Sequence, residues 1–389
     1  MLTLLTDQDE FASVVAQLVK ADRYAIDTEF HRERTYFPQV ALIQLAWDDQ
    51  VVLVDPLAID FAPFADVLHG PGVCVMHAGG QDLEVLDIAC GAQPSVMFDT
   101  QIAAGFLGLS SASLASLLKK FLNVDVAKGD RLTDWLQRPL TDAQLVYAAG
   151  DVDNLLALAS ILEEKLVARN RLAWAIEECD VALHKPRNRR TPEEAVARIK
   201  EARSLKGDAY RVATALAAWR ERRAATTDTP VRQVLPDIAI VAIAQTQPTN
   251  VEALKKLRGV DGRHLRNSAD QEIISAVQVG LRMPKDSPPP VVRGADLPRE
   301  LRPVLPLLTS WISQICRDND LDPAQVATRS DIEALLSNSE HCRLNMGWRA
   351  ELVGEPIHQL VSGRAAVAFD DGRLVLEARS GESVANEGQ

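Results

Sequence analysis

Three strand-length apolar segments follow one another near the start of the chain, and they constrain its fold more than any other feature. The segments span residues 24–30, 40–47 and 51–55, with short breaks between them. Segments of this length and spacing are typical of successive strands of one sheet. Together with the helical patterns that continue to about residue 170, they predict an α/β domain.

Helical patterns follow these strands. A fourth buried strand is expected at residues 73–77, and it runs through two glycines into a helix carrying Leu83, Leu86 and Ile88 at helical spacing. Another helix is expected to start at Thr141, with an acid in its first turn. It carries apolar residues at helical spacing from Leu145 to Ile161. This order places helices on a sheet that is already formed by the preceding segments.

The length of the chain predicts more than one domain, because 389 residues exceed a single compact core. Prolines mixed with basic residues, and later the run M-P-K-D-S-P-P-P, indicate linkers between folded parts. We expect six parts: an α/β domain over 1–170, a basic linker with a helix over 171–204, a helical domain over 205–285, a proline-rich spacer over 286–295, a second helical domain over 296–370, and a tail over 371–389.

The distribution of charge suggests that these parts divide the work. The chain has a net charge of −12, but residues 181–295 hold 21 Lys and Arg against 12 Asp and Glu. Residues 1–180 hold 12 against 27. Phosphates are bound through Lys and Arg, so the basic middle part is the expected contact for a polyanion. Solvated helix faces rich in arginine would give the same count, and charge alone does not separate the two interpretations.

Two acids stand on one face of the first predicted strand. Asp27 and Glu29 in Y-A-I-D-T-E-F are two residues apart, so their side chains point to the same side. Two such acids repel each other and are costly to bury, and a metal ion removes both penalties. Taken alone, the pattern also fits the end of a strand that emerges into solvent.

Three further residues extend this pattern. Asp82 begins a helix after a buried strand, at the edge where open α/β sheets place ligands. Tyr147 and Asp151 in Y-A-A-G-D are four residues apart on a predicted helix and share one face. Each has an ordinary alternative, as a helix-start acid or a surface hydrogen bond. Four acids on three elements can nevertheless converge on two divalent cations about 4 Å apart, which are suited to phosphodiester hydrolysis.

These segments resemble the three motifs of the DEDD superfamily of 3′→5′ exonucleases, in the subclass with a tyrosine four residues before the last aspartate. The blocks F-P-Q-V-A-L-I-Q-L, M-F-D-T-Q, D-W-L-Q-R-P-L-T and A-A-G-D-V-D-N-L-L are similar to those of the ribonuclease D family. The resemblance covers residues 1–170, and the helical domains resemble HRDC modules more loosely. It implies a ribonuclease H-like α/β exonuclease domain with a mixed sheet flanked by helices, followed by two small all-α HRDC-like domains.

The resemblance also implies roles for the five residues. Asp27 would bridge two metals, Glu29 and Asp151 would complete the first site, and Asp82 would hold the second. Tyr147 would orient the attacking water, since an ordinary tyrosine pKa of about 10 makes it a poor base at neutral pH. All-oxygen ligands favour Mg²⁺ or Mn²⁺. Scattered cysteines, without a C-x-x-C pair, argue against zinc.

Candidate nucleic-acid contacts lie in two places. An aromatic residue among arginines can stack a base and hold phosphates, although a core tryptophan with surface arginines fits equally well. Basic residues of the first helical domain are the expected tether for RNA. The candidates are Arg131, Trp135, Arg138, Arg220, Arg222, Arg223, Lys255 and Lys256.

The function predicted from these observations is a hydrolytic 3′→5′ exoribonuclease that releases 5′-nucleoside monophosphates from tRNA precursors and other structured RNAs. A 3′→5′ exodeoxyribonuclease is the alternative, and a catalytically silent nucleic-acid-binding protein is a more distant one. The apolar runs are strand-length and the N-terminus turns acidic early, so we expect no membrane span and no secretory signal. A cytoplasmic monomer without an obligate protein partner is the expected form.

Overall fold

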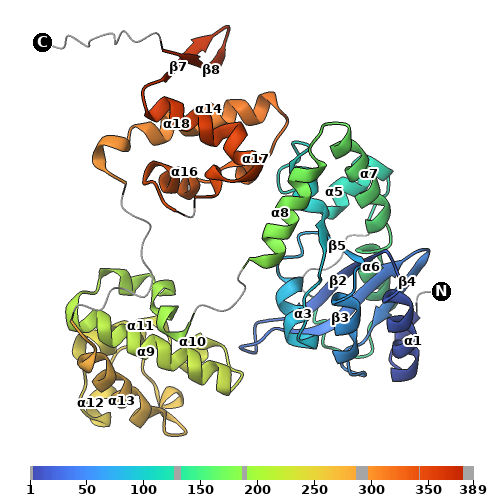
Figure 1. The fold of residues 1–389 in the computed structure, drawn as a ribbon. Helices are drawn as coiled ribbons and strands as arrows, with labels where there is room; N and C mark the ends of the chain where they lie inside the picture. The colour runs from blue at the N-terminus through green and yellow to red at the C-terminus, as the bar shows by residue number, and fades with distance from the viewer. Residues whose placement is uncertain (1–2, 127–132, 186–190, 286–296, 341, 380–389) are drawn as a thin grey trace, which may run out of the picture.

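The computed structural model describes residues 3–126, 133–185, 191–285, 297–340 and 342–379 (Figure 1). It contains an N-terminal α/β domain with a six-stranded sheet, followed by two helical domains. The expected fold class, a mixed sheet flanked by helices with two helical domains after it, is confirmed. The predicted spacer at 286–295 lies outside the described residues.

The sheet of the α/β domain is mixed. Its strands are β1 (Thr3–Leu5), β2 (Arg23–His31), β3 (Gln39–Trp47), β4 (Gln50–Val54), β5 (Val73–Met76) and β6 (Met97–Asp99). They lie in the order β1-β4-β3-β2-β5-β6, with β3 antiparallel to both its neighbours and the other pairs parallel. The four predicted strands are confirmed as β2 to β5. No pattern predicts β1 and β6, because three residues are too few to show one.

Helices cover both faces of this sheet. They are α1 (Gln8–Leu18), η1 (Ala62–Phe64), α2 (Ala65–Leu68), α3 (Asp82–Cys90), α4 (Thr100–Gly105), α5 (Leu114–Leu122), α6 (Asp142–Gly150), α7 (Leu155–Val167) and α8 (Leu172–His184). Successive strand residues point to opposite sides. Accordingly Ala25 packs with α4, α5 and α7, whereas Tyr24 and Ile26 pack with α1, α2 and α3. Ile88, predicted on the apolar side of α3, is 43% exposed instead.

The helix predicted from Thr141 starts there but is not continuous. Thr141 and Gln144 form a reciprocal cap at the start of α6, yet α6 ends at Gly150 and α7 begins at Leu155. By length and composition the combined stretch would suffice to cross a membrane. Its leucines are instead buried in the domain core, and Glu163 pairs with Arg23 of β2 at 2.7 Å. The stretch is therefore a pair of core helices, and their break faces the sheet.

The first helical domain is built around one long helix. Its elements are η2 (Pro192–Arg198), η3 (Glu201–Ser204), α9 (Gly207–Thr226), α10 (Val231–Val234), α11 (Asp237–Thr246), α12 (Val251–Leu254), η4 (Gly262–Leu265) and α13 (Ala269–Arg282). Leu216, Ile240 and Ile273 belong to one core, separate from that of the α/β domain. The domain meets the connection between β2 and β3, where the Tyr36 hydroxyl donates to Glu221 at 2.9 Å.

The second helical domain ends in a hairpin. Its elements are η5 (Arg299–Leu301), α14 (Val304–Asp318), α15 (Pro323–Val326), α16 (Arg329–Leu336), η6 (Arg343–Asn345), α17 (Gly347–Arg349), η7 (Ala350–Gly354), α18 (Glu355–Val361), β7 (Ala365–Asp370) and β8 (Arg373–Ala378). The antiparallel pair β7–β8 was not predicted, and it lies across the predicted boundary between the second helical domain, residues 296–370, and the tail, residues 371–389. The alternating sequence A-A-V-A-F-D, G-R-L-V-L-E-A is the signal that predicts it.

The second helical domain shares a hydrophobic core with the α/β domain. Leu308, Trp311 and Trp348 belong to the same buried cluster as Phe106 and Leu158. The Trp348 ring lies 5.1 Å from that of Phe106. Because one cluster continues across the boundary, these two parts fold against each other, although the sequence predicts them as separate domains.

Candidate active site

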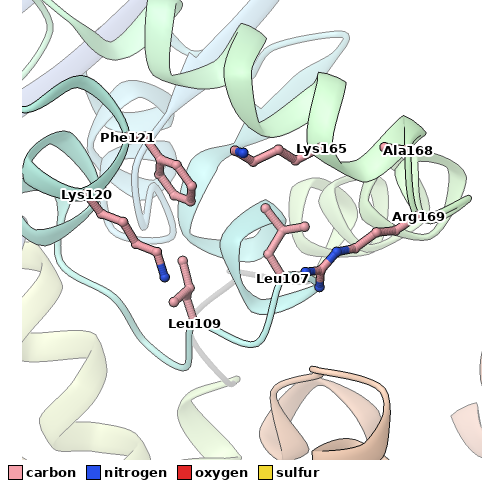
Figure 2. Close-up of a pocket in the computed structure, with 7 residues that line it drawn as sticks. All are labelled: Leu107, Leu109, Lys120, Phe121, Lys165, Ala168 and Arg169. Atoms are coloured by element: carbon pink, nitrogen blue, oxygen red, sulfur yellow. The ribbon is translucent and has the colours of Figure 1, made fainter.

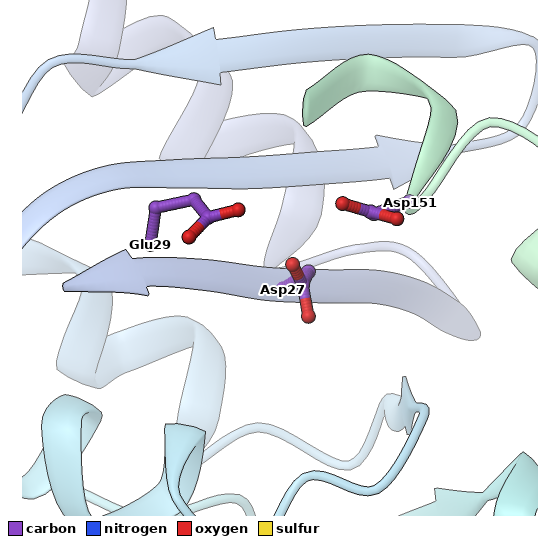
Figure 3. Close-up of side chains that lie close together, drawn as sticks. All are labelled: Asp27, Glu29 and Asp151. Atoms are coloured by element: carbon purple, nitrogen blue, oxygen red, sulfur yellow. The ribbon is translucent and has the colours of Figure 1, made fainter. Parts of the chain in front are cut away.

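Three carboxylates converge where β2 passes the break between α6 and α7. Asp27 and Glu29 lie two residues apart on β2 and point to the same face of the sheet. Asp151 is the C-cap residue that follows α6. Carboxylate oxygens of the three acids lie within 4.8 Å of one another, and Figure 3 shows the three groups facing a common space. The structure thus brings together residues that are up to 124 positions apart in the sequence.

Asp82, the fourth predicted acid, lies beside this group and not within it. It is the first residue of α3 and is only 8% exposed. The hydroxyl of Thr28 donates to Asp82 Oδ1 at 2.5 Å. After burial, repulsion from Asp82 is the largest effect that raises the pKa of both Asp27 and Asp151, so Asp82 adds to the negative charge of the site.

The environment makes negative charge costly at all four positions. Burial raises the pKa of Glu29 from the usual 4.5 to about 8, and repulsion from Asp151 and Asp82 adds to this. Burial, with repulsion from Asp82, raises the pKa of Asp151 from 3.8 to about 6. The pKa values of Asp27 and Asp82 are also raised, first by burial. A bound cation would offset the cost of these buried negative charges. The all-oxygen donors of the site suit a hard divalent ion.

Comparison with known proteins identifies the family of this chain. A family model described as 3′-5′ exonuclease matches residues 2–167, and the HRDC domain model matches residues 209–277. The chain is 34% identical to ribonuclease D of Gluconacetobacter diazotrophicus over 376 residues, which covers 95% of each protein. It is 34% identical to ribonuclease D of Nitrobacter hamburgensis over 389 residues, covering 97% of this chain and 100% of the relative. The chain belongs to the ribonuclease D family.

A solved structure supports the same assignment. Escherichia coli RNase D superposes with a TM-score of 0.83 at 31% identity, covering 93% of this chain and 99% of the relative. The likeness therefore includes both helical domains as well as the nuclease domain. As a member of the ribonuclease D family, the chain is a 3′→5′ exoribonuclease, and all five predicted catalytic positions fall within the exonuclease match.

Tyr147, one of the predicted catalytic residues, packs against Trp135. Tyr147 lies on α6, one turn before Asp151, and its ring centroid is 6.1 Å from that of Trp135. Trp135 is only 8% exposed and belongs to a small core with Leu42 and Leu53 of the sheet. The prediction that Trp135 stacks a base is therefore wrong, because its ring is covered by its own domain.

Arg138, near Trp135, has structural partners in place of the predicted nucleic-acid contact. Arg138 makes a two-pronged pair with Asp55, at 2.6 and 2.7 Å, and also donates to the Ala41 carbonyl. These bonds occupy its guanidinium with structural partners and lower the pKa of Asp55, although burial of that carboxyl acts in the opposite direction. Arg131 lies outside the described residues.

Of the predicted RNA-binding cations of the first helical domain, Arg220 and Arg223 are held by partners within the domain. The others are exposed on its surface. Arg220 is 3% exposed and bonds to Asp237 and the Leu235 carbonyl, so its prediction as an RNA contact is wrong. Arg223 is held by Glu272 at 2.8 Å. On the surface, Arg222 and Lys255 pair with exposed acids, whereas Lys256 has no ion pair in the described part of the chain.

Two polar residues at the site escape prediction from the sequence. Thr28 stands between Asp27 and Glu29 on β2, and its hydroxyl donates to Asp82 across the free edge of that strand. Gln44 of β3 lies directly opposite Asp27 and is fully buried. Its amide has no hydrogen-bond partner among the described residues. A glutamine inside the apolar run V-A-L-I-Q-L-A-W is the one signal that marks the position, since buried polar groups are costly.

Proposed function

We propose that this chain hydrolyses RNA from the 3′ end with two divalent ions, releases 5′-nucleoside monophosphates, and trims structured RNAs such as tRNA precursors. The observation that carries the proposal is the cluster of Asp27, Glu29 and Asp151 within 4.8 Å, with pKa values raised by burial and mutual repulsion. Escherichia coli RNase D is described as an exoribonuclease involved in structured RNA processing. That description supports the choice of substrate.

The donor set fits hard divalent cations such as Mg²⁺ or Mn²⁺. Asp27, Glu29 and Asp151 would hold one ion, and Asp82 with Asp27 would hold the second. When bound, the ions lower the pKa of a water and neutralise charge on the leaving oxygen. Carboxylates are matched to this task because oxygen ligands select Mg²⁺ and Mn²⁺ over zinc.

The surrounding residues position the acids and the water. Thr28 fixes Asp82 through its hydroxyl, and packing against Trp135 fixes the ring of Tyr147. Tyr147 would orient the attacking water, and the bound ions would supply the acidity of that water. The exposed residues Arg222, Lys255 and Lys256 of the first helical domain are the remaining predicted contacts for the body of the RNA.

One assay tests the function directly. The protein is incubated with Mg²⁺ or Mn²⁺ on a 3′-extended tRNA and on a matched single-stranded DNA, beside an Asp27→Ala variant. Release of 5′-nucleoside monophosphates from the RNA, absent in the variant, is the expected result. Products from DNA alone would replace the proposal with an exodeoxyribonuclease, and no products from either substrate would leave a binding protein.

Loss of the Thr28 hydroxyl should weaken use of the metal while the fold is retained. In Thr28→Val the Asp82 carboxylate loses its fixed donor, and outer-shell changes of this kind typically cost about 10- to 100-fold in metal affinity or activity. Activity measured against Mg²⁺ concentration should shift to higher concentration. Thr35→Val, which alters a threonine bonded only to a loop carbonyl, is the matched control. An unchanged Mg²⁺ dependence in Thr28→Val would contradict the role of Thr28.

The raised pKa values predict that, as pH rises, the stability of the metal-free protein falls and the stabilisation by Mg²⁺ increases. Between about pH 4 and 8 the folded protein keeps protons on Glu29 and Asp151 that the unfolded chain releases, so metal-free stability falls as pH rises. Mg²⁺ binds the deprotonated acids and should therefore raise the melting temperature more at pH 8 than at pH 6. Thermal unfolding with and without Mg²⁺ at both pH values measures this, and an equal increment would refute it.

A further inference from the structure

A hollow on the nuclease domain lies apart from the four acids. Its volume is about 380 Å³, and it is bounded by α5, by the end of α7 and by the segment after α4 (Figure 2). Apolar and basic side chains alternate around it. The lining residues are Leu107, Leu109, Lys120, Phe121, Lys165, Ala168 and Arg169. We refer to this hollow as the Phe121 pocket.

An aromatic ring and two ammonium groups occupy the same wall of the Phe121 pocket. Lys120 Nζ lies 5.7 Å from the centroid of the Phe121 ring, and Lys165 Nζ lies 5.5 Å from it. Figure 2 shows Lys120 reaching towards the hollow from α5, and Lys165 and Arg169 reaching towards it from α7 and its C-terminal end. Both lysines are exposed, whereas Phe121 is half-buried. An aromatic face beside cations is the arrangement that single-stranded nucleic acid requires.

The two lysines of the pocket lack acidic partners among the described residues. This is unusual for the nuclease domain, because residues 1–180 hold 12 Lys and Arg against 27 Asp and Glu and most of the described cations pair with an acid. Lys120 and Lys165 have neither an ion pair nor a side-chain hydrogen bond among the residues that the structure describes. Lys165 and Arg169 are also one helical turn apart, where like charges repel. Arg169 has only a loose, exposed pair with Asp320 at 3.5 Å.

We propose that the Phe121 pocket binds a nucleotide of the RNA strand upstream of the active site. A base would pack against Phe121 and the neighbouring leucines, and the ammonium groups of Lys120 and Lys165 would contact the adjoining phosphates. Cations alone would suit any anion, but the aromatic and apolar lining selects a ligand with both a base and a phosphate. This inference rests on the proposed function, because it assigns a second contact to the same substrate.

The position of the pocket sets the length of RNA that can use it. α7 begins at Leu155, shortly after Asp151, and Lys165 lies ten residues further along that helix. At 1.5 Å per residue the two ends are separated by about 15 Å. A stacked strand rises about 3.4 Å per nucleotide, so roughly five nucleotides span this distance. A stacked trinucleotide bound at the active site is therefore too short to reach the pocket, whereas a 12-mer is long enough.

Paired variants of the full-length chain test the proposal. Binding of a single-stranded RNA 12-mer is measured in EDTA over a range of salt concentrations, and hydrolysis of the 12-mer and of a trinucleotide is measured with Mg²⁺. In Lys120→Ala/Lys165→Ala the affinity at 0.1 M salt should fall about tenfold, and the slope of log K against log salt should shrink by about 1.4. Hydrolysis of the trinucleotide should be unchanged. Lys20→Ala removes another exposed lysine of the same domain and should alter none of these values.

A second variant separates the aromatic contact from the charge. Phe121→Leu keeps an apolar side chain, so it should weaken binding of the 12-mer without changing the salt slope. Wild-type slope and affinity in the double lysine variant would overturn the proposal, as would equal losses on the trinucleotide and the 12-mer. If the wild-type protein hydrolyses no RNA, the proposed function fails. That result is separate from the binding measured in EDTA.

Discussion

Replacing Asp27 with asparagine should abolish most hydrolysis and, at the same time, stabilise the metal-free protein. Burial raises the pKa of Asp27, and the charges of Asp82, Asp151 and Glu29 raise it further. Asparagine has almost the same volume and no charge, so the repulsion within the cluster decreases. The melting temperature in EDTA at pH 8 should therefore rise.

The loss of activity has the opposite sign because the same charge is needed for the reaction. Metal ions contribute several kcal/mol of transition-state stabilisation. If Asp27→Asn forfeits about 4 kcal/mol of this, kcat falls roughly 10³-fold. Mg²⁺ should also lose most of its stabilising effect on the variant.

The matched control for this experiment is Asp153→Asn. Asp153 is an exposed aspartate two residues beyond Asp151, so the substitution removes the same charge near the site without removing a predicted ligand. Its kcat should stay within about twofold of the wild type, as is usual for surface substitutions. A variant of Asp27 that loses stability in EDTA would show that Asp27 holds the fold together, and would contradict the assignment of its charge to metal binding.

The sequence predicts those features of the site that depend on the periodicity and the order of single strands and helices. Alternation on a strand placed Asp27 and Glu29 on one face, and the order of strands and helices placed Asp82 at the sheet edge. The break after Gly150 was not predictable, because the leucines continue at helical spacing on both sides of it. That break turns Asp151 towards β2.

Composition does not predict which acid each arginine binds when the two residues are far apart in the sequence. A count of arginines predicts a basic surface, but Arg138 binds an acid 83 residues away and Arg223 one 49 residues away. Such partners depend on the packing of whole elements, which no local pattern contains. The contact of Thr28 with Asp82 has the same origin, since it forms across an edge of β2 that β5 pairs with only as far as Ala25.

The packing of the second helical domain against the nuclease domain could not be predicted for a related reason. The sequence shows a proline-rich spacer and a helical part after it, which together favour a separate domain. In the structure the rings of Trp174 and Trp348 stack at 5.0 Å, one from each side of that boundary. Removal of residues 205–389 would therefore expose Trp174 and the adjoining core of the nuclease domain.

Arg349→Ala should be among the most destabilising single substitutions in the chain. Arg349 is 4% exposed, donates to the Gln325 and Val326 carbonyls, and forms a buried ion pair with Glu178 of α8. Without Arg349, the carboxylate of Glu178 stays buried and has lost its cation. Breaking a buried pair in this way costs about 3–5 kcal/mol.

Urea unfolding followed by tryptophan fluorescence measures this cost, since the stacked rings of Trp174 and Trp348 report directly on the interface. Arg329→Ala is the control, because Arg329 pairs with Glu333 at 2.8 Å but its side chain is 79% exposed. That loss should stay below about 1 kcal/mol. The double variant Glu178→Ala/Arg349→Ala should recover part of the stability that Arg349→Ala loses, because it leaves no unpaired charge. If Arg349→Ala costs no more than Arg329→Ala, the second helical domain is not a structural part of the nuclease, and its removal should then spare hydrolysis.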